Sequence, residues 1–205
     1  MLPFLHIGPL AIPTFGLMVA TSFLVSGYVL QKDMNRRRAQ LEHLPGFKFQ
    51  PDEGLFISLI AGISGLLGAR LYHVLEDPAT LFADPAGQLF SRFGFAWFGG
   101  LIGGLLALVI ISRRLHVPML LFFDICSPAA ALGYGIGRIG CLLSGDGDYG
   151  IPTRLPWGMS FPNGVVPSGP VCLQYGFPAD CRVQPTPIYE LLMSVAIAAF
   201  LWAME

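Results

Sequence analysis

The sequence predicts an all-α protein that crosses a membrane several times, and three observations support this prediction. Of the 205 residues, 54% are hydrophobic and only 12% are charged, whereas soluble domains carry about 25% charged residues. Several apolar runs approach the ~20 residues that a helix needs to span a bilayer. Basic residues cluster between these runs. We therefore expect a polytopic helical membrane protein with about five spans in a single transmembrane domain, residues 1–205.

The first half of the chain contains three of the expected spans. Residues 9–30 form the first span, which we expect to remain uncleaved because no basic segment precedes it, as it would in a signal peptide. The second and third spans are expected at 55–75 and 93–111. Basic residues follow the first and third spans: Lys32, Arg36, Arg37, Arg38, Arg113 and Arg114. The positive-inside rule makes both loops cytoplasmic, so the N-terminus is expected outside.

Two features of this half concern surfaces and packing. The segment 77–93 is acidic and contains proline and glycine, so we expect a surface arm on the outer side of the membrane. The third span carries two overlapping GxxxG patterns, formed by Gly99, Gly100, Gly103 and Gly104. Such patterns predict that one helix packs closely against another.

The second half contains two further spans and a polar insertion. The spans are expected at 118–143 and 188–204, and the segment 144–187 between them is rich in glycine, proline and aromatic residues. We expect this insertion to form a small irregular extracytoplasmic head. Its two cysteines, Cys172 and Cys181, form a disulfide if the head faces an oxidising compartment and are otherwise free thiols. Cys126 and Cys141 lie in or beside apolar sequence and are interpreted as packed thiols.

One stretch at the end of the fourth span carries the strongest sign of function. It reads GYGIGRIGCLLSGDGDYG over residues 133–150 and places Arg138 among glycines, with Asp146 and Asp148 shortly after. An arginine inside apolar sequence is costly and indicates a functional site. The glycines remove side-chain bulk, so that another helix or a lipid headgroup can approach the backbone. The net charge of −1 argues against a nucleic-acid-binding protein. We therefore expect an anion-binding centre at a membrane surface.

Five segments resemble a known family. The stretch GRIGCLLSGDGDYG is similar to the signature of the bacterial phosphatidylglycerol–prolipoprotein diacylglyceryl transferases, in which Gly-Arg-x-Gly-Asn is followed by an acidic residue. Four further segments resemble other motifs of that family in the same order: IPTFGLM, GARLYHVL, WFGGLIGG and RVQPTPIYE. The order and spacing fit across almost the whole chain.

The resemblance implies an enzyme of the bacterial inner membrane. Such an enzyme moves the diacylglyceryl group of phosphatidylglycerol onto the thiol of a lipobox cysteine in a prolipoprotein signal peptide and releases glycerol phosphate. Its partners are therefore phosphatidylglycerol, the prolipoprotein and the membrane, and neither a metal nor an organic cofactor is expected. The implied catalytic residues are Arg138 and Asp146. The implied substrate-binding residues are Arg138, Arg70, Tyr72, Gly99, Gly100 and Glu190.

Each of these residues also has a purely structural interpretation. Arg138 can bind a phosphate with two donors, or it can form an ion pair with Asp146 or Glu190. Asp146 also suits a plain turn. Residues near the membrane surface have structural roles open to them as well: Arg70 can extend to the interface, Tyr72 can belong to an aromatic belt, and Glu190 can stabilise a helix start. His73 can act as a base or have no role.

The sequence departs from the family pattern at positions that matter for chemistry. Phe98 stands where the family has a histidine, and Cys141 stands where it has an asparagine. The family normally continues with two more spans, so the sequence is expected to be a fragment or a short, diverged member. These departures support a different function, that of a non-catalytic membrane protein that binds phospholipid or lipoprotein.

Overall fold

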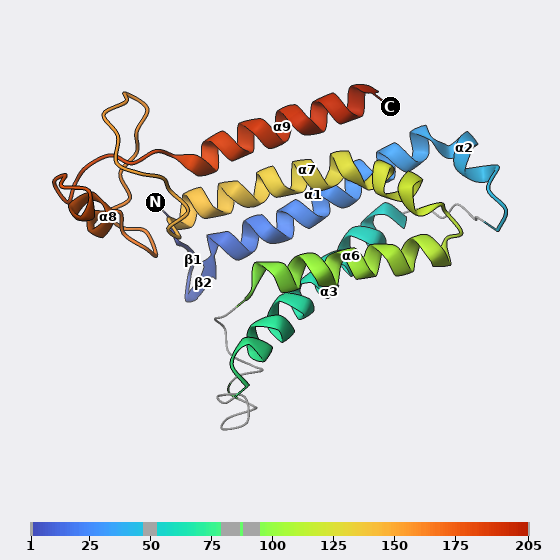
Figure 1. Ribbon diagram of the computed structural model, residues 1–205, viewed down its shortest axis with the longest axis horizontal. Helices are drawn as coiled ribbons and strands as arrows, with labels where there is room; N and C mark the ends of the chain where they lie inside the picture. The colour runs from blue at the N-terminus through green and yellow to red at the C-terminus, as the bar shows by residue number, and fades with distance from the viewer. Residues whose placement is uncertain (1, 47–52, 79–86, 88–94, 205) are drawn as a thin grey trace. The chain divides into compact units, whose positions relative to one another are not determined.

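The computed structural model of the protein describes residues 2–46, 53–78, 87 and 95–204. Within these residues, five helices are long and apolar enough to cross a membrane (Figure 1). They are α1 (Thr14–Arg36), α3 (Glu53–Glu76), α6 (Trp97–Arg114), α7 (Met119–Ser144) and α9 (Thr186–Met204). The chain is therefore a multi-pass membrane protein, and the predicted all-α fold is confirmed.

The N-terminal segment differs from the prediction, because a β-hairpin precedes the first span. Strand β1 (Phe4–Ile7) pairs antiparallel with β2 (Leu10–Pro13). Gly8 supplies the left-handed backbone of the turn, with a φ of 61°. The expected start of the span at residue 9 was wrong because hydropathy does not separate an apolar strand from the start of an apolar helix. The helix instead begins at Thr14, whose hydroxyl donates to the carbonyl oxygen of Leu2 at 2.6 Å.

The described chain divides into two compact units. Unit 1 comprises Met1–Ser26 and Ser127–Glu205, and unit 2 comprises Gly27–Cys126. The interpretation of residues 1–205 as a single transmembrane domain stays a prediction. Most of the predicted arm at 77–93 lies outside the described residues.

In unit 1, α7 lies between α1 and α9 (Figure 1). Glycines make both contacts close. A Cβ added to Gly140 would lie 3.1 Å from the Cβ of Met18 on α1, and one added to Gly135 would lie 3.1 Å from the Cβ of Ser194 on α9. The prediction that glycines of this stretch admit a neighbouring helix is therefore confirmed at these two positions.

In unit 2, α3 and α6 pack through a seam of glycines. A Cβ on Gly68 of α3 would come within 3.0 Å of the Cα of Gly103 on α6, so the two backbones nearly touch. The amide of Ala96 also donates to the carbonyl oxygen of Ala69 at 3.1 Å. The GxxxG patterns thus mark a helix–helix contact, as predicted.

The end of α1 in unit 2 carries a buried ion-pair network. Asp33 is fully buried, and its carboxylate lies 3.0 Å from Arg36 and 3.3 Å from Arg37. Arg37 also reaches Asp124 of α7 at 2.9 Å. Two of the basic residues that follow the first span are therefore paired with acids of the same unit.

The segment between α7 and α9 forms the irregular head that the sequence predicted. It contains one short helix, α8 (Gly169–Gln174), and a small apolar core of Phe161, Cys172 and Val183. A disulfide joins Cys172 to Cys181, which decides the question that the sequence left open. Cys126 and Cys141 are buried free thiols, as predicted.

Candidate functional site

The candidate site is built around Arg138, near the C-terminal end of α7. Tyr134 precedes it by one helical turn, so both side chains lie on the same face of the helix. The Tyr134 hydroxyl oxygen accepts hydrogen bonds from Nε and Nη2 of Arg138, at 3.0 and 2.7 Å. The guanidinium carbon also lies 4.8 Å from the centroid of the Tyr134 ring, in a cation–π contact. One edge and one face of the guanidinium group are thus held by a residue of its own helix.

Glu190 reaches the same edge from α9. Its Oε2 lies 2.5 Å from Nε of Arg138 and also accepts a hydrogen bond from the Tyr134 hydroxyl. The first turn of α9 includes Pro187, which suits a helix start because its missing N–H has no helical partner there. The early position of Glu190 in α9 therefore directs a carboxylate at Arg138.

The other edge of Arg138 faces the loop after α7. Nη1 forms an ion pair with Asp148 and lies 3.5 Å from Sγ of Cys141. The acidic partner supplied by this loop is Asp148, rather than the Asp146 that the sequence interpretation considered. Asp146 instead accepts a hydrogen bond from the Asp148 amide, at 3.3 Å.

Glycines and backbone contacts fix the shape of this loop. Gly145 and Gly147 have φ values of 60° and 103°, which side-chain-bearing residues rarely adopt. The carbonyl oxygen of Asp148 accepts a hydrogen bond from the Thr186 hydroxyl at the start of α9. The loop therefore turns back towards α9 and brings Asp148 to Arg138.

Tyr149 ties the same loop to the head. Its ring stacks on Phe161 at 5.1 Å between centroids, and its hydroxyl donates to the carbonyl oxygens of Val166 and Pro167 at 3.1 and 2.8 Å. Burial raises the pKa of Tyr149 above its usual value near 10, so the hydroxyl keeps its proton at neutral pH. Tyr149 is thus held in place by ring stacking and hydrogen bonds within the head.

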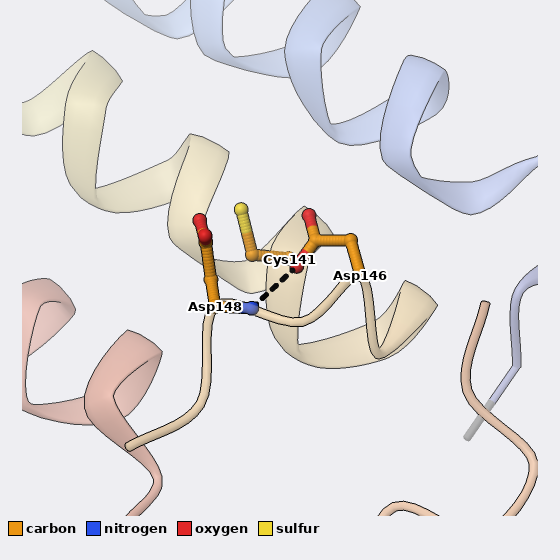
Figure 2. Close-up of side chains that lie close together, drawn as sticks. All are labelled: Cys141, Asp146 and Asp148. Atoms are coloured by element: carbon orange, nitrogen blue, oxygen red, sulfur yellow. Dashed lines mark hydrogen bonds between the residues drawn. The ribbon is translucent and has the colours of Figure 1, made fainter. Parts of the chain in front are cut away.

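Three potential metal ligands lie side by side at the site. Figure 2 shows Cys141 on α7 with Asp146 and Asp148 on the following loop, and their ligand atoms all lie within 4.8 Å of one another. A thiolate and two carboxylates are suitable ligands by type. Arg138 contacts both Cys141 and Asp148 and so already places one positive charge beside these ligand atoms. The expectation of a metal-independent site stays a prediction.

The charge balance at Arg138 is negative. One guanidinium contacts two carboxylates, and a third carboxylate, Asp146, lies beside them. The side chain of Arg138 is 21% exposed, compared with 52% for Asp148 and 32% for Glu190. An anionic ligand of Arg138 must therefore compete with these carboxylates. Of the two that Arg138 contacts, Asp148 is the more exposed.

The remaining predicted site residues belong to unit 2. Arg70 is buried, at 8% exposure, with its guanidinium carbon 5.7 Å from the centroid of the Phe95 ring. This burial differs from the interpretation in which the side chain extends to the membrane surface. Gly99 packs against Gly68 and Tyr72 of α3.

The other residues of unit 2 that the sequence singled out are less buried than Arg70. Tyr72 is 39% exposed and Phe98 is 62% exposed. His73 lies 3.7 Å from Glu76, one turn further along α3. Gly100 lies opposite Ala69 with room for a methyl group. The substrate-binding roles of Tyr72 and Gly100 and the role of His73 as a base stay predictions.

Sequence reasoning missed two members of the Arg138 cluster. Tyr134 carried a usable signal, because its spacing from Arg138 places both on one helix face. Asp148 was not among the predicted site residues, because the family motif pointed to Asp146, two positions earlier. In the structure, the loop has left-handed backbone at Gly145 and Gly147, and it is the Asp148 carboxylate that pairs with Arg138.

The fold and this cluster define a multi-pass membrane protein with an arginine-centred polar site at the end of a transmembrane helix. A family model described as prolipoprotein diacylglyceryl transferase matches residues 3–205. The chain belongs to the prolipoprotein diacylglyceryl transferase family, and the resemblance seen in the sequence is confirmed.

Relatives named phosphatidylglycerol–prolipoprotein diacylglyceryl transferase occur in several bacteria. The one from Leifsonia xyli subsp. xyli is 31% identical, over 98% of this chain and 58% of the relative. The one from Clostridium tetani is 28% identical, over 91% of this chain and 67% of the relative. The one from Bordetella parapertussis is 32% identical, over 97% of this chain and 69% of the relative. The chain thus spans 58% to 69% of the length of these three relatives.

Proposed function

We propose that this chain transfers the diacylglyceryl group of phosphatidylglycerol to the lipobox cysteine of prolipoproteins and releases glycerol phosphate. Family membership supports the reaction type, and the names of the relatives supply the two substrates. The observation that carries the proposal within the chain is Arg138. Its guanidinium group lies at the end of a transmembrane helix with one edge directed at an exposed carboxylate.

The reaction requires a cation where the phosphate leaves. A C–S bond forms between the cysteine sulfur and a glyceryl carbon, while the C–O bond from that carbon to the phosphate breaks. The electron pair of the broken bond leaves on the phosphate oxygen, and the cysteine proton passes to a base. Arg138 is the proposed cation, since a guanidinium group binds a phosphate with two parallel donors. Its stabilising effect grows as negative charge develops on the leaving oxygen.

The second requirement is a thiolate, because the thiolate rather than the thiol is the nucleophile. Phe98 replaces the histidine of the family pattern and offers no base. Asp146 is the proposed base, since its carboxylate lies beside Cys141 at the same loop that carries Asp148 (Figure 2). Arg70, Tyr72, Gly99, Gly100 and Glu190 are the proposed substrate-binding residues.

We also propose an orientation in the bacterial inner membrane. The basic residues after α1 and at the end of α6 favour a cytoplasmic position for both loops, with the N-terminus and the head outside. The disulfide between Cys172 and Cys181 supports an outer head, because disulfides persist in oxidising compartments.

A second candidate function is phospholipid or lipoprotein binding without catalysis. It is favoured by Phe98 and Cys141, which replace a histidine and an asparagine of the family pattern. Binding would retain the role of Arg138, whereas the transfer step would be lost.

A transfer assay in reconstituted membranes distinguishes these functions. The chain is incubated with phosphatidylglycerol and a lipobox peptide, and glycerol phosphate release is measured. The transferase proposal predicts release that requires Arg138. Binding of phosphatidylglycerol without any release would contradict the transferase proposal and support the non-catalytic one.

A further inference from the structure

The two edges of the Arg138 guanidinium group are held in different ways. Nε and Nη2 bond the hydroxyl of Tyr134, and Nε also pairs with Glu190. Glu190 and Tyr134 bond each other as well, so this edge belongs to a closed network between two transmembrane helices. The Nη1 edge faces Asp148 and Cys141. A ligand that approaches the Nη1 edge therefore disrupts fewer contacts than one that approaches the Nε and Nη2 edge.

Of the two carboxylates that contact Arg138, that of Asp148 is the more easily displaced by a ligand. Its side chain is 52% exposed and lies on a loop, whereas Glu190 is 32% exposed and lies on a helix of 19 residues. Exposed ion pairs contribute little to stability, because water screens the two charges. The loop itself is held through the Asp148 carbonyl oxygen, which accepts from Thr186, so its anchoring does not depend on the carboxylate.

The helix surface beside Arg138 also leaves room for a ligand. Gly137 lies on the face that carries Tyr134 and Cys141. Apart from its adjacent residues and its own helix backbone, a Cβ built on Gly137 would meet no atom within 4 Å, whereas one on Gly133, Gly135 or Gly140 would contact side chains of neighbouring helices. The open surface thus adjoins the helix face that carries Arg138.

We propose that the carboxylate of Asp148 marks the phosphate subsite, and that the phosphodiester of a lipid headgroup binds Arg138 by displacing it. This inference rests on the proposed function of Arg138 as the phosphate-binding residue. Charge supports the displacement, since a phosphate added to one guanidinium and two carboxylates would face repulsion from both. Tyr134 and Glu190 keep the guanidinium group in place during the exchange, and Tyr134 acts as a positioning residue.

Asp148→Asn is the variant that tests this exchange. It removes the negative charge and keeps the shape of the side chain. The probe is dihexanoyl phosphatidylglycerol, added to the full chain in a neutral detergent, and the readout is its dissociation constant by calorimetry. We expect binding to tighten about two- to fivefold, the range that corresponds to loss of one exposed ion pair. Asp148→Ala should change the affinity in the same direction.

Two controls separate this proposal from its rivals. Asp180→Asn makes the same charge change at an exposed head residue and should leave the affinity unchanged. In an Arg138→Ala background, Asp148→Asn should no longer tighten binding, because no guanidinium group remains for the carboxylate and the phosphate to compete for. Unchanged or weaker binding by both Asp148 variants would overturn the proposal, as would a gain that persists without Arg138.

The same data distinguish failure of the proposed function. If Arg138→Ala binds the lipid as well as the unaltered chain does, Arg138 is not the phosphate site and both proposals are wrong. If binding depends on Arg138 but Asp148→Asn does not tighten it, only the exchange is wrong. A parallel titration with glycerol phosphate tests the source of the phosphate. A gain for glycerol phosphate alone would contradict a lipid headgroup as the displacing ligand.

Discussion

The guanidinium group of Arg138 contacts Tyr134 and Glu190 along one edge and Asp148 and Cys141 along the other. An arginine at the centre of a membrane span costs about 2.5–3.5 kcal/mol on insertion scales. Placement near the end of α7 and two carboxylate partners reduce that cost. The same partners hold the group in a defined orientation, which a phosphate-binding residue needs.

The hydroxyl of Tyr134 should contribute to lipid affinity through this orientation. Tyr134→Phe keeps the ring beneath the guanidinium group but removes the acceptor for Nε and Nη2. We expect the dissociation constant for dihexanoyl phosphatidylglycerol to rise roughly three- to tenfold, since a hydrogen bond contributes about 0.5–1.5 kcal/mol. Calorimetric titration in detergent measures this change.

Tyr189→Phe is the matched control for that variant. Tyr189 also lies in unit 1, but its hydroxyl bonds Gln184 and Trp157 instead of Arg138. The control should leave lipid affinity within about twofold of the unaltered chain. Equal losses in the two variants would mean that Tyr134 acts through general stability and not through Arg138.

At the residue scale, the sequence pointed to positions that were individually unusual, and the roles assigned to them stay predictions. An arginine among apolar residues and glycines identified Arg138, and the family motif pointed to Glu190, which the structure places at its side. The family motif pointed to Asp146, whereas the structure pairs Asp148 with Arg138. The loop that carries both aspartates contains Gly145 and Gly147, whose left-handed φ values the residue type permits but does not determine.

The glycine seam between α3 and α6 shows how closely two transmembrane helices approach. Gly99 and Gly100 are neighbours in sequence and differ in environment. A Cβ on Gly99 would collide with the Gly68 carbonyl oxygen and the Tyr72 side chain, whereas one on Gly100 would lie 3.6 Å from its nearest neighbours. Packing alone therefore separates two positions that the sequence motif treats alike.

Alanine substitutions test this difference directly. Gly99→Ala should lower the free energy of unfolding by about 1–3 kcal/mol, because the backbones must move apart. Gly100→Ala should be neutral or stabilising by up to about 1 kcal/mol, because alanine is the better helix former. Thermal unfolding in detergent measures both. A larger loss for Gly100→Ala than for Gly99→Ala would contradict the described seam.

At the element scale, the sequence predicted all five long helices but not the N-terminal hairpin. Length and hydropathy identify a membrane-spanning helix, while the short apolar run over Leu10–Pro13 continues the hydropathy of the first span and forms a strand. The disulfide of the head was also undecided, because the pairing of Cys172 and Cys181 depends on the fold of the head around Val183 and Phe161.

Composition and charge placement determined the whole-molecule prediction. A hydrophobic content of 54% and clusters of basic residues sufficed to identify a multi-pass membrane protein. They also predict the orientation, in which the head lies outside and the loop after α1 lies inside. The head disulfide agrees with this orientation.

Cysteine labelling in intact cells tests the orientation. Val165→Cys places a thiol at a 61% exposed position of the head, and Glu42→Cys places one at a half-exposed side chain after α1. A membrane-impermeant maleimide should label the head variant from outside and the loop variant only after permeabilisation. Cys126 and Cys141 are buried, so the unaltered chain supplies the background. Labelling of the loop variant alone in intact cells would reverse the orientation.

The central claim is that Arg138 binds the phosphate of phosphatidylglycerol for diacylglyceryl transfer. The most direct measurement is glycerol phosphate release from phosphatidylglycerol and a lipobox peptide in reconstituted membranes. We expect release by the unaltered chain and a loss of roughly 100-fold or more in Arg138→Ala. Arg154→Ala removes an exposed arginine of the head and should retain full release. Equal release by the unaltered chain and Arg138→Ala, or no release by the unaltered chain, would contradict the claim.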